Sequence, residues 1–149
     1  MKQPYYTFKT NPTQLTFTFE SISYDKSIQK IVIYTPFYEN DEVYNLAFGD
    51  IISDGEFDDE AVSNNKDANK ILATVIQTIL VFFETYPTKT VFLTGSTPAR
   101  TRLYQIIINR EASMLSEQFD IKGIRNGLSE VVVPNIKYDA FLIKLKTKK

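Results

Sequence analysis

Residues 90–105, with the sequence TVFLTGSTPARTRLYQ, decide the fold that we expect for this chain. The first five residues are apolar on both faces of an extended segment, which is typical of a central strand covered on both sides. Pro98 suits the first position of a helix, and Thr97 before it suits the N-cap. The stretch therefore predicts a buried strand that leads through a short loop directly into a helix.

Upstream of this stretch, alternating apolar residues predict an antiparallel meander. Residues 14–21 (QLTFTFES) place Leu15, Phe17 and Phe19 on one face, and residues 28–37 and 42–50 read as the next two strands. Residues 5–10 (YYTFKT) are a candidate edge strand, and Pro36 is expected to end the pairing of the second strand.

A long polar and acidic loop is expected at residues 50–67, followed by a helix that begins within residues 63–70 and ends before Pro87. Asn64 or Asn65 is the predicted N-cap, and Asp67 favours the positive end of the helix dipole. Apolar residues recur at helical spacing from Ile71 to Phe83, so this helix is expected to be largely buried.

Downstream of Arg102, the helix from Pro98 is expected to bury Leu103, Ile106, Ile107 and Met114. Residues 119–124 (FDIKGI) read as a short strand and residues 126–135 (NGLSEVVVPN) as a loop. Residues 138–146 (YDAFLIKLK) read as a last strand, with Phe141, Ile143 and Leu145 on one face and Lys144 and Lys146 on the other.

The element order predicts an α+β fold, in which an N-terminal antiparallel β-meander is followed by α-β-α-β-β, with a mixed sheet and two main helices. The 149 residues contain no repeat, linker or low-complexity tract, so a single domain spanning 1–149 is expected.

Composition excludes several kinds of chemistry. The chain has no Cys and no His, which rules out thiolate catalysis, disulfides and a Ser-His-Asp triad. The net charge of -1 argues against a basic nucleic-acid-binding surface over the whole protein. Residues 1–10 carry no signal-peptide pattern, and the most apolar run, ILATVIQTILVFF, is too short to span a bilayer. We expect a cytoplasmic protein that does not interact with membranes.

The loop and helix start at Gly95–Arg102 form the leading candidate site. Gly95, Ser96 and Thr97 bring backbone and hydroxyl donors to the positive end of a helix, and Arg100 and Arg102 add charge that suits phosphate or carboxylate. Two arginines at a positive helix end need compensation. Either a bound anion supplies it, or the chain's own carboxylates do, in which case the stretch is only a well-capped helix.

A second candidate is the acidic region, because no Lys or Arg occurs from Ile31 to Asn65. Asp50, Asp54, Asp58 and Asp59 are weak candidates for binding a hard cation such as Mg²⁺. An EF-hand register from Asp50 fails at Ile52 and Ala61, and a solvated acidic loop is the simpler interpretation.

Several stretches resemble a family of small uncharacterised bacterial proteins: NLAFGD (45–50), GSTPARTRLY (95–104) and YDAFLI (138–143). The resemblance spans about residues 17–144. It implies a bacterial protein but no activity, cofactor or catalytic residue.

Three functions remain open from the sequence. The first is a binding module for a phosphate-bearing ligand or nucleic acid at Gly95–Arg102. The second is a Mg²⁺-dependent phosphoryl-transfer enzyme or nuclease that uses the acidic loop. The third is a protein-protein interaction component, either with a partner or as a homo-oligomer.

Overall fold

The protein is described by a computed structural model that covers residues 4–22, 26–51, 57–58 and 67–146. It is an α+β fold with a mixed sheet, as the sequence predicted. The chain divides into two compact units, which are described separately: residues 1–35 with 47–85, and residues 36–46 with 86–149. The expectation of a single domain remains a prediction.

The first unit contains the N-terminal meander. Its strands are β1 (Phe8–Thr10), β2 (Thr16–Ile22), β3 (Ser27–Pro36) and the second half of β4 (Val43–Ile51), in that order, with the antiparallel β5 (Phe57–Asp58) on β4. The predicted edge strand and the three predicted meander strands are therefore confirmed. The predicted loop at 50–67 is partly wrong, because Asp50 and Ile51 belong to β4 and pair with β5.

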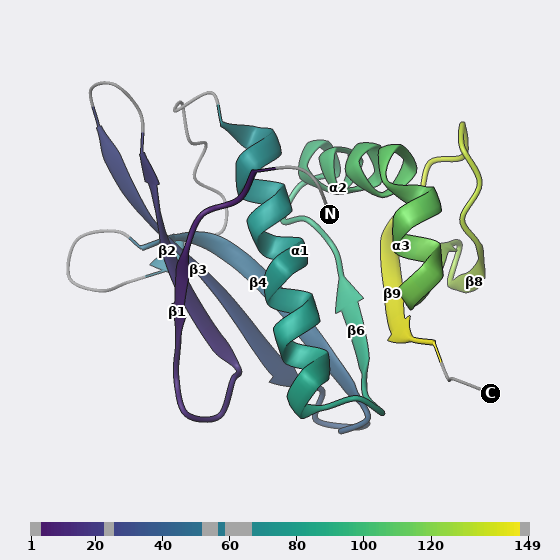
Figure 1. The fold of residues 1–149 in the computed structure, drawn as a ribbon. Helices are drawn as coiled ribbons and strands as arrows, with labels where there is room; N and C mark the ends of the chain where they lie inside the picture. The colour runs from purple at the N-terminus through teal and green to yellow at the C-terminus, as the bar shows by residue number, and fades with distance from the viewer. Residues whose placement is uncertain (1–3, 23–25, 52–56, 59–66, 147–149) are drawn as a thin grey trace. The chain divides into compact units, whose positions relative to one another are not determined.

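Helix α1 (Ala68–Thr85) runs across one face of these strands (Figure 1). The alternation in β2 turns Phe17 and Phe19 toward the helix side, where both are buried. Tyr34 of β3 stacks on Phe82 of α1, with ring centroids 4.5 Å apart. The helix begins after Asp67, whose carbonyl accepts from the Ile71 N–H at 2.9 Å. The predicted caps Asn64 and Asn65 lie outside the described residues.

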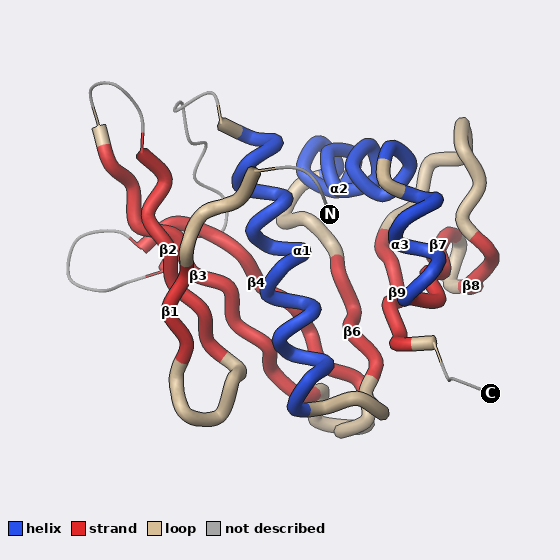
Figure 2. Tube along the Cα trace, in the orientation of Figure 1, coloured by secondary structure: helices blue, strands red, loops and turns tan. Residues whose placement is uncertain are grey.

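The second unit contains the first half of β4, followed across the sheet by β6 (Thr90–Leu93), β9 (Ala140–Leu145), β7 (Phe119–Arg125) and β8 (Leu128–Val131). Strand β6 pairs parallel to β4 and antiparallel to β9, so the apolar run TVFLT is a central strand, as predicted. The parallel pair of β4 and β6 makes the sheet mixed, and Figure 2 shows its strands in red.

Two helices follow β6, namely α2 (Pro98–Arg110) and α3 (Ala112–Gln118). The predicted inner face of α2 was wrong in part, because Leu103 and Ile106 are 45% and 46% exposed, whereas Ile107 is buried as predicted. The buried residues of α2 are Thr101, Tyr104, Gln105, Ile107 and Ile108. Two of these buried residues, Thr101 and Gln105, are polar, so a pattern of apolar residues cannot predict that they face the interior.

The predicted loop at 126–135 was also wrong in part, because residues 128–131 form β8, paired with β7 in a tight hairpin. Asn126 and Gly127 occupy the turn with φ of 54° and 75°. Such an Asn-Gly pair is the preferred turn for a two-residue hairpin. Within the described residues, none of the helices has both the length and the apolar character needed to cross a bilayer.

Candidate anion-binding site

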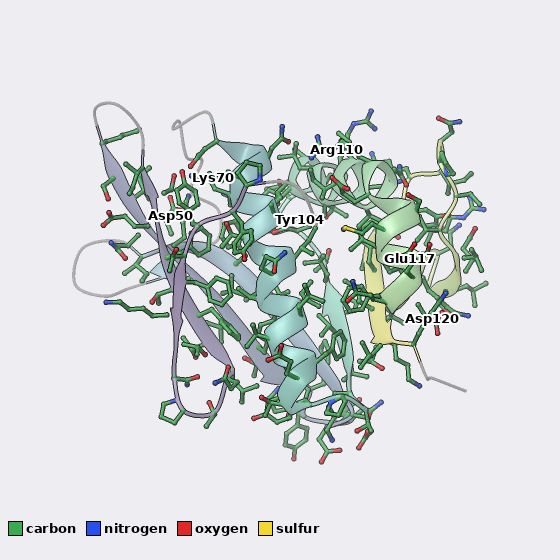
Figure 3. All side chains as sticks on the ribbon, viewed as in Figure 1. Asp50, Lys70, Tyr104, Arg110, Glu117 and Asp120 are labelled. Atoms are coloured by element: carbon green, nitrogen blue, oxygen red, sulfur yellow. The ribbon has the colours of Figure 1, made fainter. Side chains whose placement is uncertain are left out.

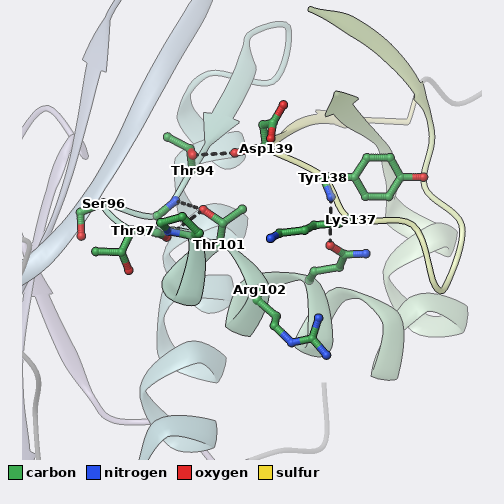
Figure 4. A pocket seen from close by; sticks show the side chains of 11 residues that line it. Thr94, Ser96, Thr97, Thr101, Arg102, Lys137, Tyr138 and Asp139 are labelled. Atoms are coloured by element: carbon green, nitrogen blue, oxygen red, sulfur yellow. Dashed lines mark hydrogen bonds between the residues drawn. The ribbon is translucent and has the colours of Figure 1, made fainter. Parts of the chain in front are cut away.

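A hollow of about 290 Å³ opens in the second unit where β6 leads into α2 (Figure 4). Its wall consists of Thr94–Pro98, of Thr101, Arg102 and Gln105 on α2, and of Lys137–Asp139 just before β9. Ligand pockets in proteins usually measure roughly 300–1,000 Å³, so this hollow is of a size for a small group.

The start of α2 has the geometry that the sequence predicted. Thr97 is the N-cap, and its Oγ1 accepts from the Arg100 N–H at 3.2 Å. Gly95 lies so close to the helix that a Cβ there would come 2.5 Å from the Thr101 nitrogen. The Gly95 N–H donates to Thr101 Oγ1 at 2.9 Å, so this backbone donor is used inside the protein. Gly95 therefore shapes the hollow, and its N–H is already engaged.

The two predicted arginines occupy different places. Arg102 lines the hollow, but Arg100 does not. Residues two apart on a helix point about 200° apart, which explains the difference. The second cation in the wall is Lys137, which the sequence analysis missed. Among the described residues, none of these three cations forms an ion pair.

Lys137 is held in place through its two neighbours. The buried Gln105 side chain donates from Nε2 to the Ile136 carbonyl and accepts at Oε1 from the Tyr138 N–H at 3.4 Å. Both bonds tie the backbone around Lys137 to α2. The backbone at Lys137 is thereby fixed beside the helix, with its side chain in the wall of the hollow (Figure 4).

Tyr138 anchors the same segment on its other side. Its ring is buried against Gly123 of β7, where a side chain on residue 123 would collide with it. Its hydroxyl accepts from the Val133 N–H at 2.9 Å and donates to the Val131 carbonyl at 3.3 Å. These two part-buried bonds tie the segment between β8 and β9 to the Tyr138 hydroxyl, so this segment forms a defined wall.

Asp139 adds a carboxylate to the wall, while its carbonyl accepts from Thr94 Oγ1 at 2.8 Å. A carboxylate here opposes an anion and lowers its affinity. The hollow therefore combines two cations with one acid, and the cations outnumber it. Ser96, which the sequence analysis proposed as a hydroxyl donor, also lines the hollow.

The acidic candidates are placed differently. Asp50 is 8% exposed and forms an ion pair from Oδ1 to the buried Lys30 Nζ on β3. Asp58 is in β5, without a described side chain, and Asp54 and Asp59 lie outside the described residues. In the described ranges, no three acidic side chains come together as a group that could hold a metal ion.

The chain belongs to the Family of unknown function (DUF6934), whose family model matches residues 2–146. No curated protein and no solved structure matches it.

Proposed function

We propose that this protein binds a small anionic group, a phosphate or a carboxylate, in the hollow between α2 and the segment before β9. Arg102 and Lys137 supply the positive charge, and Ser96 and Thr97 lie at the helix start beside it. Arg100 supplies long-range charge only, because it does not line the hollow.

One observation carries the proposal: two cations from different elements meet in one hollow, and neither forms an ion pair among the described residues. The first turn of α2 contains no acidic residue that would offset its positive end. The sequence left two alternatives, a bound anion or compensation by the chain's own carboxylates. The cations that are unpaired among the described residues and the absence of an acidic residue in the first turn of α2 favour the bound anion.

The side-chain chemistry sets the class of ligand. A guanidinium fork binds two oxygens of one phosphate or carboxylate, while an ammonium acts as a point charge. Both side chains are exposed, so each contributes modestly and in a salt-dependent way. We expect weak binding of a free anion and tighter binding of a larger ligand that carries one.

Titration calorimetry with inorganic phosphate, sulfate and acetate tests the proposal at low and high salt. The double variant Arg102→Gln/Lys137→Gln should weaken binding about 10-fold, which is the effect of losing two exposed charge pairs. The control is Arg100→Gln, which removes one positive charge two residues from Arg102 but outside the hollow.

Binding that survives the double variant, or that falls equally in Arg100→Gln, would exclude this hollow as the site.

The proposal extends to a bacterial and cytoplasmic setting, supported by the resemblance of the sequence blocks and by the lack of cysteine. The metal-dependent enzyme and the protein-partner function remain hypotheses.

A further inference from the structure

A second hollow of about 340 Å³ lies further along α2 in the same unit. It shares Arg102, Gln105 and Lys137 with the first hollow, so the two adjoin at the pair of cations. A ligand with its anionic group in the first hollow can therefore continue into the second without leaving the protein surface.

The chemistry of the second hollow differs from that of the first. Its remaining wall contains two amides, Asn109 of α2 and Asn135 of the following segment, together with Ile106 and Ile136. Within the described part of the chain, neither amide side chain has a hydrogen-bond partner. Ile106 is 46% exposed although it is a large apolar side chain.

Amides beside apolar side chains suit a flat heterocycle. An asparagine side chain donates and accepts at once, which matches the paired donor and acceptor on the edge of a nucleobase. An exposed isoleucine offers apolar surface to the face of the ring. A single ligand could then place its phosphate beside Arg102 and Lys137 and its base beside the two asparagines.

We infer that the two adjoining hollows bind a nucleoside phosphate, with its phosphate at Arg102 and Lys137 and its base against Asn109, Asn135 and Ile106. This inference rests on the proposed anion site and assigns its ligand class. The same chemistry occurs in a free nucleotide and in the 5′-phosphorylated end of a nucleic acid strand.

The backbone conformation of Asn135 allows its amide side chain to be removed without straining the backbone. Its φ is 72°, a conformation that glycine adopts without strain. Asn135→Gly therefore removes the amide and keeps the backbone, and Asn109→Ala does the same on a helix. Asn126→Gly is the matched control, because Asn126 also has a positive φ, of 54°, and lines neither hollow.

The experiment compares the four nucleoside monophosphates with ribose 5-phosphate, inorganic phosphate and a 5′-phosphorylated tetranucleotide by titration calorimetry. We expect at least one nucleotide to bind about 5-fold or more tighter than ribose 5-phosphate, the gain from a paired amide contact to a base. That gain should disappear in Asn109→Ala/Asn135→Gly and persist in Asn126→Gly. A tighter tetranucleotide would identify the strand end as the source, and equal or weaker binding would identify the free nucleotide.

Two other outcomes separate the inferences. If nucleotides and ribose 5-phosphate bind equally and both weaken in Arg102→Gln/Lys137→Gln, the nucleotide inference is overturned and the anion site stands. If no phosphate compound binds the wild-type protein, both are overturned.

Discussion

The buried pair of Lys30 and Asp50 allows a test of what stabilises the first unit. Lys30→Met removes the ammonium group and keeps a side chain of similar length. In the wild type, the two side chains are only 3% and 11% exposed and form an ion pair across β3 and β4 (Asp50 is labelled in Figure 3). Lys30 Nζ also lies 5.9 Å from the centre of the Phe48 ring.

The expected cost follows from this burial. Removing one partner of a buried pair leaves a charge without compensation, which costs about 3–5 kcal/mol. A domain is stable by about 5–15 kcal/mol in total, so the variant should lose a large share of its stability. At about 2–4 °C per kcal/mol, its melting temperature should fall by roughly 6–20 °C.

A double variant isolates the charge from the change in packing. Lys30→Met/Asp50→Asn replaces the lone carboxylate by a neutral amide, whose unsatisfied burial costs about 1–3 kcal/mol. It should therefore be more stable than Lys30→Met alone. Lys89→Met is the matched control, because the 3.0 Å pair of Lys89 with Glu42 is at the surface and should matter little.

Urea unfolding followed by circular dichroism measures these differences, with a second probe to check for a single transition, because the chain has two compact units. A loss below about 1 kcal/mol in Lys30→Met, or a double variant no more stable than the single one, would refute the argument from burial.

Three further predictions follow from local geometry. Gly95→Ala places a methyl group 2.5 Å from the Thr101 nitrogen, so it should lower the free energy of unfolding by about 1–3 kcal/mol and weaken phosphate binding, both measurable on one purified sample. Asp139→Asn removes the opposing carboxylate from the hollow and should tighten phosphate binding a few-fold by calorimetry, an effect that shrinks at high salt. Burial raises the pKa of Tyr34 above its ordinary value of 10.0, although the bond to Thr78 opposes this, so the folded state favours the protonated phenol. This stabilisation is present below pH 10 and is lost as the pH rises beyond it; melting temperatures from pH 9 to 12 should therefore fall less steeply in Tyr34→Phe.

Local patterns were sufficient for much of the fold. The alternation of Phe17 and Phe19 predicted β2 because a half-buried strand shows its two faces directly in sequence. The Thr97–Pro98 pair predicted the start of α2 because capping involves only neighbouring residues. The hairpin at Asn126–Gly127 carried an equally local signal, which the interpretation of residues 126–135 as a loop overlooked.

The buried face of α2 could not be predicted from such local sequence patterns. Leu103 and Ile106 are apolar and exposed, whereas Thr101 and Gln105 are polar and buried. Both buried side chains bond to segments outside their own helical turn: Thr101 to the Gly95 N–H, and Gln105 to the backbone on either side of Lys137. Partners of this kind reverse the usual preference for apolar residues inside a protein.

By itself, the sequence determined most of the elements of this protein, the mixed α+β order and the start of the helix at which a site was predicted. Only the tertiary structure decided which charges meet. It brought Lys137 beside Arg102, turned Arg100 away from the hollow, and paired Asp50 with Lys30. The reason is that periodicity and helix capping depend on residues close together along the chain. Contacts such as those of Lys137 and Asp50 depend instead on strand register and on the packing of segments 20 or more residues apart.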